Sequence, residues 1–187
     1  MGEHVLKSDG YFTYKELRDW PEEERWELID GEAFAMSSPT SDHQRVLIKL
    51  VARLADWFES KSCEPFVAPL DVLLRIRPEQ DEDEVDTVLQ PDLMVVCDPG
   101  KVHRNGIHGA PDWVLEILSP STTWRDQTIK RGLYEKHGVK EYWVLNPDTL
   151  DLMIYRLVDG KFAAPIGASL KDPVSVGLFP GLILRLT

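Results

Sequence analysis

The chain has 187 residues, of which 43% are hydrophobic, and a formal net charge of -11 at pH 7. That length suits one domain with a substantial core, and the composition excludes a disordered chain. The acidic balance weighs against a protein that holds nucleic acid on a basic surface, although carboxylates that bind divalent cations would account for part of it. No apolar run reaches the roughly 20 residues that span a bilayer, and no signal sequence begins the chain, so we expect a cytoplasmic protein.

The sequence carries no common metal-binding or redox motif. Cys63 and Cys97 lie far apart, and neither belongs to a spacing typical of zinc or redox sites. We therefore expect both to be small, buried hydrophobic residues. The acidic run 79–84 lacks the glycine and the final glutamate of an EF-hand loop, which favours a solvated loop over a calcium site.

The N-terminal segment 11–36 is predicted to hold a short helix followed by a hairpin. Two strand-like runs in residues 25–36 are joined by Asp30-Gly31, a dipeptide that favours a type I′ turn. With that turn, four side chains share one face of the hairpin: Glu27, Ile29, Glu32 and Phe34.

The strongest helical pattern in the chain covers residues 42–61. Apolar residues recur there at i, i+3 and i+4 spacing, from Val46 to Phe58. Ser41 and Gln44 fit a capping box at the start of the helix. We expect its apolar stripe to pack on one face of a sheet.

Two later runs are typical of strands that are buried on both faces. Residues 113–118 form an apolar run without polar alternation, and residues 90–97 repeat the pattern with Asp92 near the start. Glu116 interrupts the first run, where an unpaired carboxylate would cost several kcal/mol or lose its charge. A cation, a network of donors or a metal must compensate it, so Glu116 is the strongest functional signal in the sequence.

The other patterns complete an α/β domain. They predict a loop at 98–109, a helix at 124–137 closed by Gly138, a hairpin from 140–145 and 152–157, and an apolar edge element at 173–187. We find no internal repeat or linker, so a single domain, with its core at 41–157, is the economical interpretation.

Three residues are predicted to converge on one site. If the strands that carry Asp92 and Glu116 are neighbours, both carboxylates reach a common point and supply hard oxygen ligands for Mg²⁺ or Mn²⁺. Lys130 shares a helix face with Asp126 and Tyr134 at i±4 spacing. If that face turns toward the sheet, the ammonium can hold a nucleophilic water or stabilise charge on a phosphate.

Several motifs together carry a resemblance to a known family. They are Gln90-Pro91-Asp92, the run 109–121, residues 125–143 and, in the N-terminal part, residues 26–32 and 41–44. With these motifs the chain resembles the Uma2 family of bacterial proteins, which is assigned to the PD-(D/E)XK restriction-endonuclease-like superfamily. The resemblance covers most of the chain.

The resemblance implies roles for particular residues. Asp92 matches the Pro-Asp aspartate of the superfamily, and Glu116 matches its second acidic metal ligand. Leu118 stands where the usual pattern has lysine. Members of the family use a lysine on the next helix instead, and Lys130 matches that position.

Further candidates come from the N-terminal part, and structural alternatives stay open for each of them. Glu27 or Glu32 matches the extra acidic residue that the superfamily recruits there, and His43, near a helix N-terminus, is a candidate for lining the cleft. The hairpin carboxylates could equally lie on the surface, and His43 could be an ordinary helix-start residue. Asp92 could simply begin its strand. Glu116 could be a structural carboxylate paired with Lys130 or a histidine, and Lys130 could be solvated.

The resemblance implies a restriction-endonuclease-like α/β fold, with a central mixed sheet between the helices at 42–61 and 124–137. It also implies hydrolysis of phosphodiester bonds with Mg²⁺ or Mn²⁺, DNA as the substrate, and a homodimer. Two alternatives remain. Leu118 and the acidic charge favour a catalytically inactive nuclease fold that serves as a binding or regulatory module. The lack of a basic stripe in the sequence leaves a hydrolase of smaller phosphate esters open as a third hypothesis.

Overall fold

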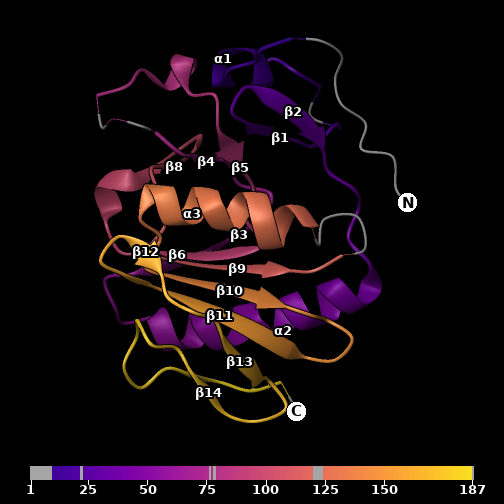
Figure 1. The fold of residues 1–187 in the computed structure, drawn as a ribbon, viewed down its shortest axis with the longest axis vertical. Coiled ribbons are helices and arrows are strands. Elements are labelled where there is room, and N and C mark those ends of the chain that lie inside the picture. The colour runs from indigo at the N-terminus through magenta and orange to yellow at the C-terminus, as the bar shows by residue number, and fades with distance from the viewer. Residues whose placement is uncertain (1–9, 22, 76, 78, 120–123, 187) are drawn as a thin grey trace.

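Two β-sheets organise the fold of this computed structural model, which describes residues 10–21, 23–75, 77, 79–119 and 124–186. The smaller sheet has six strands in the order β2-β1-β5-β4-β8-β7, and the larger has seven, in the order β12-β11-β10-β9-β6-β3 with β13 beside β11. Figure 1 shows the smaller sheet at the N-terminal end of the molecule. This is the mixed α/β fold that the sequence predicted.

The smaller sheet is built from short strands. Its members are β1 (Trp26–Ile29), β2 (Glu32–Ala35), β4 (Val72–Leu73), β5 (Val88–Leu89), β7 (Val102–His103) and β8 (Gly106–His108). The predicted hairpin is confirmed: Asp30 and Gly31 have φ values of 48° and 83°, as a type I′ turn requires, and the register pairs Glu27 with Phe34 and Ile29 with Glu32.

The larger sheet contains the most deeply buried strands. Its members are β3 (Glu64–Val67), β6 (Leu93–Val96), β9 (Trp113–Ile117), β10 (Glu141–Leu145), β11 (Asp151–Val158), β12 (Lys161–Phe162) and β13 (Ile166–Ser169). As predicted, every residue of β9 is buried, because β9 pairs with β6 on one side and with β10 on the other. The strand that carries Glu116 therefore lies at the centre of the fold.

Helices cover both faces of the larger sheet. The described residues form the α-helices α1 (Tyr14–Leu17), α2 (Ser41–Phe58) and α3 (Arg131–His137), the 3₁₀ helices η1 (Glu82–Glu84) and η2 (Pro99–Lys101) and the π-helix η3 (Arg125–Lys130), of which α1 packs against the smaller sheet. Figure 1 shows α2 and α3 on opposite sides of the larger sheet, as expected. Within the described ranges, no helix is long and apolar enough to cross a membrane.

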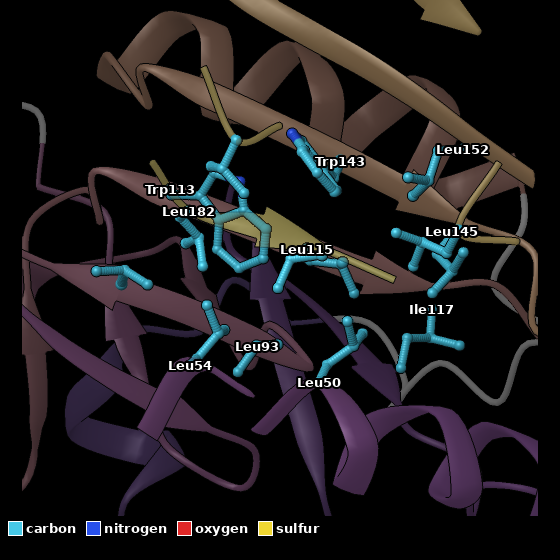
Figure 2. Packing of buried hydrophobic residues seen from close by; sticks show 14 of the residues in the cluster. Leu50, Leu54, Leu93, Trp113, Leu115, Ile117, Trp143, Leu145, Leu152 and Leu182 are labelled. Atoms are coloured by element: carbon cyan, nitrogen blue, oxygen red, sulfur yellow. The ribbon is translucent and has the colours of Figure 1, made fainter. Parts of the chain in front are cut away.

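The two faces have separate hydrophobic cores. On one face, α2 packs toward the larger sheet. Leu50 and Leu54 of the helix belong to the same buried cluster as Trp113, Leu115 and Trp143 of β9 and β10 (Figure 2). The core on the other face joins α3, the larger sheet and residues of the smaller sheet. The smaller sheet is thereby fixed to the face that carries η3 and α3.

The start of α2 differs by one residue from the prediction. Thr40, not Ser41, is the N-cap, and its hydroxyl accepts a hydrogen bond from the backbone N–H of His43 at 3.2 Å. Thr and Ser are both preferred N-cap residues, because either hydroxyl can accept a hydrogen bond from a free N–H group of the first turn. The sequence Thr40-Ser41 therefore does not show which residue is the N-cap. The register chosen buries the His43 side chain, which is 7% exposed.

One segment was predicted wrongly. Residues 98–109 are not a plain loop, because η2 and the hairpin β7–β8 lie in them. The C-terminal tail, which was predicted as an apolar edge element, is not part of the larger sheet. Its strands β14 (Val174–Ser175) and β15 (Ile183–Leu184) form a separate two-stranded sheet, and between them Phe179 and Leu182 pack into the α2 core.

The two cysteines also differ from expectation. Cys63 and Cys97 form a disulfide, and both are only partly buried. Cys63 precedes β3 and Cys97 follows β6, and these antiparallel strands pair Glu64 with Val96. The strand register therefore brings together two residues that the sequence showed only as distant hydrophobic positions.

Candidate active site

Both sheets contribute to a pocket at the N-terminal end of α2. The segment 36–39 forms one side of it, and α2, η3 and the strand ends around Asp92 and Ile117 form the rest. Its charged and titratable lining residues are Arg25, Glu27, His43, Asp92, Glu116, Arg125 and Lys130. The structure thus brings Asp92, Glu116, Lys130, Glu27 and His43 together, whereas Glu32 is exposed on β2 and is not among the lining residues.

Asp92 and Glu116 are neighbours across two paired strands. The register of β6 and β9 places Leu93 opposite Leu115, so the residue before Leu93 lies opposite Glu116. Asp92 Oδ2 accepts a hydrogen bond from the backbone N–H of Ile117 at 2.8 Å. The backbone N–H of Asp92 in turn lies 3.4 Å from Glu116 Oε2. Both carboxylates therefore reach one point, as the sequence predicted for neighbouring strands.

Glu116 is held by donors from the helix above it. It is 3% exposed, and its Oε1 accepts hydrogen bonds from Lys130 Nζ at 3.0 Å and from the Tyr134 hydroxyl at 2.7 Å. Burial, and then the negative charge of Glu116, raise the pKa of Tyr134 well above its ordinary value. The phenol therefore stays protonated and remains a donor to the carboxylate.

Lys130 is a buried residue that joins the two sheets. It is 3% exposed, and its Nζ lies 2.8 Å from Glu27 Oε1 and 3.0 Å from Glu116 Oε1. Glu27 belongs to the smaller sheet and Glu116 to the larger. A solvated lysine is thus excluded, and the helix face that carries Lys130 and Tyr134 turns toward the sheet as expected.

A π-helical segment brings a second cation to Glu27. Arg125 and Lys130 are five residues apart, a spacing that does not share a face of an α-helix but matches the i→i+5 repeat of η3. Arg125 Nη1 lies 3.4 Å from Glu27 Oε2, and Arg125 is 4% exposed. Sequence reasoning missed Arg125 because it assumed α-helical spacing, which selected Asp126 instead, whose side chain lies outside what the structure describes.

Glu27 is a buried anchor and not a surface residue of the hairpin. It is 1% exposed, and its Oε1 also accepts a hydrogen bond from the backbone N–H of Gln90 at 3.0 Å. With Lys130 and Arg125, three donors surround this carboxylate. Burial of a carboxylate requires such compensation, so Glu27 orders the two cations of the pocket.

His43 completes the side of the pocket that α2 forms. Its Nε2 lies 3.1 Å from Asp92 Oδ2, while its Nδ1 is buried without a hydrogen-bond partner among the described residues. Asp92 Oδ2 thus has two donors, the His43 ring and the backbone of Ile117. Its Oδ1 has no partner in the part of the chain that the structure describes, and the side chain keeps 18% exposure.

Comparison with known proteins identifies the family. Residues 14–187 match the Uma2 family, which is described as "Putative restriction endonuclease". The chain belongs to the Uma2 family. This confirms the resemblance carried by the motifs around Asp92 and Glu116.

Two relatives of this Uma2 protein span most of its length. An uncharacterised protein of Synechocystis sp. is 25% identical over 148 residues, which make up 78% of this chain and 74% of that protein. A crystal structure described as a putative nuclease belonging to DUF820, from Anabaena variabilis, superposes with a TM-score of 0.69. It is 22% identical, and the match covers 89% of this chain and 90% of that one. At this identity the likeness supports the fold.

The oxygen donors of the Uma2 site fit one class of cation. Mg²⁺ is commonly bound through one or two carboxylates and several waters, and Asp92 and Glu116 supply two adjacent carboxylates. Among the residues described, no group of three or more His, Cys, Asp or Glu side chains is arranged to hold a metal ion. Any cation held by Asp92 and Glu116 would therefore have to take its other ligands from water or from the substrate.

Proposed function

We propose that this protein is an endonuclease that hydrolyses phosphodiester bonds in DNA with a divalent cation, Mg²⁺ or Mn²⁺. One observation carries the proposal. Carboxylates from two adjacent strands of the larger sheet, Asp92 and Glu116, meet a buried lysine from the following helix at a pocket. Membership of a family described as restriction endonucleases supports a nuclease, and the superfamily generally uses divalent metals.

In the proposed site, Asp92 and Glu116 hold the cation. A bound divalent cation polarises a phosphate oxygen and lowers the pKa of a coordinated water toward neutrality. The hydrogen bonds from Ile117 and His43 to Asp92 Oδ2 fix the orientation of that carboxylate, while its Oδ1 is left toward the pocket. Lys130 and Tyr134 fix Glu116 in the same way through Oε1.

Lys130 is proposed to act on the phosphate as well. Its ammonium lies beside the metal-binding carboxylate, where negative charge develops during phosphodiester hydrolysis, and a preorganised cation stabilises such charge. Glu27 is proposed as a positioning residue, because it contacts Lys130 and Arg125 and would not touch the substrate. The lysine reaches the site from η3, so Leu118 does not by itself remove the function.

Metal binding and cleavage can be tested with the same set of variants. We would titrate Mn²⁺ and Mg²⁺ calorimetrically into the wild type, Asp92→Ala and Glu116→Ala, and then assay nicking of supercoiled plasmid. The proposal expects both activities in the wild type and neither in the two variants. Glu32→Ala is the matched control, since this exposed carboxylate of the same hairpin lies outside the pocket and its loss should change neither result.

A specific observation favours a second candidate, an inactive nuclease fold that serves as a binding module. Lys130 compensates the charge of Glu116 at 3.0 Å, and a buried ion pair of this kind can be purely structural. In that case the wild type binds no metal in the titration and does not nick the plasmid, although it folds.

The proposal includes two finer expectations. A homodimer would allow two sites to cut two strands, and light scattering in solution measures the number of chains directly. Action on DNA would place the protein in the bacterial cytoplasm, which fractionation of cells that express a tagged chain can test.

A further inference from the structure

One tryptophan differs from the others in the chain. Trp124 is 64% exposed, whereas Trp26, Trp113 and Trp143 are buried and Trp57 packs on aromatic neighbours. Trp124 makes no ring contact with another described aromatic residue. Exposing an indole to water forfeits the large gain from burying it, and it leaves the face of the ring free to stack on a ligand.

The position of Trp124 suggests what it binds. It directly precedes Arg125, so the two Cα atoms lie about 3.8 Å apart, and Arg125 lines the pocket. Ser119, on the other side of the connecting segment, lines the pocket as well. Trp124 itself is not among the lining residues, so its indole lies at the margin of the pocket, beside a strand of substrate that leaves the site on this side.

The charges of the site argue against binding of double-stranded DNA through its phosphates. Both buried cations of the pocket are engaged by carboxylates, Arg125 by Glu27 and Lys130 by Glu27 and Glu116. The chain as a whole carries a net charge of -11. Double-stranded DNA has about twice the charge per unit length of a single strand, so this acidic protein repels a duplex more strongly than a single strand.

Base stacking supplies affinity without positive charge. An exposed indole stacks on any base whose face is free, and the gain does not depend on sequence. Bases inside a duplex are covered by their neighbours, so an indole on the protein surface can reach only an unpaired, frayed or displaced base.

We propose that Trp124 stacks on an unpaired base of the substrate where the strand leaves the pocket, and that the substrate is DNA with unpaired bases, such as a single strand. This inference rests on the proposed nuclease function and deepens it by naming the substrate class. Trp124 then contacts the substrate directly, while the carboxylates and Lys130 act on the phosphate.

The test compares binding of a labelled single-stranded oligonucleotide and of the matched duplex. We would measure fluorescence anisotropy with Ca²⁺ in place of Mg²⁺ to hold back cleavage, and quenching of tryptophan emission as the sign of stacking. The wild type should bind the single strand more tightly than the duplex. Trp124→Ala should weaken binding of the single strand roughly five- to a hundredfold, Trp124→Phe should weaken it less, and quenching should be lost in Trp124→Ala.

Ile48 offers a matched control. It is 69% exposed on α2, and its neighbour Leu47 lines the pocket, so Ile48→Ala removes an equally exposed apolar side chain and should leave affinity unchanged. Equal affinity of Trp124→Ala and wild type would overturn the inference, as would equal binding of duplex and single strand by the wild type. It is also overturned if Trp124→Ala converts a dimer to a monomer without changing DNA affinity, because a second copy of the chain then covers the indole.

The two proposals fail in different ways. If the wild type nicks plasmid with metal and Trp124→Ala matches it in binding and cleavage, the nuclease stands and the stacking site is wrong. If Trp124 is needed for binding a single strand but no metal-dependent cleavage occurs, the stacking site stands on a protein that is not a nuclease.

Discussion

The two sheets differ sharply in charge. Residues 1–40 and 71–91, which form β1, β2, β4 and β5 of the smaller sheet, contain 17 acidic and 6 basic residues, whereas the rest of the chain contains 15 of each. The whole formal charge of -11 therefore belongs to the segments around the smaller sheet. The remaining segments, which form the larger sheet, its helices and the β7–β8 hairpin, carry no net charge. The acidic excess therefore lies on one side of the pocket, to which that region contributes Glu27.

The two sheets also contribute different residues to the pocket. The larger sheet supplies the two carboxylates proposed to hold metal, Asp92 at the start of β6 and Glu116 within β9. The smaller sheet supplies Glu27, which contacts the two cations that accompany them and the backbone N–H of Gln90. Lys130 bridges the two. The site therefore lies at the interface between the two sheets, and a change in either sheet can disturb it.

Removing the bridge should produce the largest effect. In Lys130→Met, Glu27 and Glu116 stay buried with one shared cation missing, and loss of one partner from a buried ion pair costs about 3–5 kcal/mol. We expect the free energy of unfolding, measured by urea titration, to fall by about that amount. Lys161→Met is the control, because the Lys161 side chain is 80% exposed beside Glu135 and such pairs contribute at most about 1 kcal/mol.

An unchanged stability of Lys130→Met would mean that Arg125 and Tyr134 alone compensate the two carboxylates. The ion pairs of Lys130 would then contribute less to the stability of the interface between the sheets than their distances suggest. The double variant Glu27→Gln with Lys130→Met measures the coupling between the two residues. Because they belong to one network, its loss of unfolding free energy should differ from the sum of the two single losses.

Local patterns predicted much of the larger sheet and of the site. The apolar run at 113–118 identified a central strand, and the carboxylate inside it identified Glu116, because burial of a charge demands a partner wherever it occurs. The Asp30-Gly31 turn fixed the hairpin register from two residues. These predictions needed only short-range rules, which also selected Asp92 and Lys130, and the family motifs then implied the roles of these residues.

Features that depend on helix pitch or strand register were not predicted. Arg125 reaches Glu27 only because η3 is a π-helix, and nothing in the local sequence distinguishes that pitch from an ordinary α-helix. The Cys63–Cys97 pair depends on the register of β3 and β6, which lie far apart in the chain. In both cases tertiary packing selects the geometry, so a reading of single segments misses it.

The disulfide joins the ends of two neighbouring strands of the larger sheet, β3 and β6, so breaking it tests that sheet by itself. Its cysteines are 34 residues apart, and closing a loop of that length is worth about 3–4 kcal/mol in the chain-entropy model, a value that engineered bonds often do not reach. We therefore expect Cys63→Ser with Cys97→Ser to lower the free energy of unfolding by about 2–4 kcal/mol, measured by urea titration.

Reducing agent provides the internal control for this prediction. Dithiothreitol should destabilise the wild type toward the level of the double variant and leave the double variant unaffected. Equal stability of the wild type with and without reductant would show that the cysteines are not paired in solution.

The smallest expected effect concerns two histidines where the smaller sheet meets the C-terminal end of α3. His137 Nδ1 lies 3.2 Å from the carbonyl oxygen of Arg75, and Arg75 Nη2 lies 3.0 Å from His108 Nδ1. Burial lowers the pKa of both imidazoles. The charges of His103 and Arg75 lower the pKa of His108 further, and that of Lys136 lowers the pKa of His137 further.

These lowered pKa values give the junction a pH dependence of definite sign. An unfolded imidazole titrates near pH 6.5, so as the pH falls through about 6.5 the unfolded chain takes up protons that the folded chain does not, and stability decreases. Urea titrations between about pH 7.5 and 5.5 should show this decrease in the wild type and a shallower one in His108→Gln with His137→Gln. Parallel slopes in the two proteins would mean that the histidines are accommodated in their charged form, and the junction would then hold the sheets together equally well in acid.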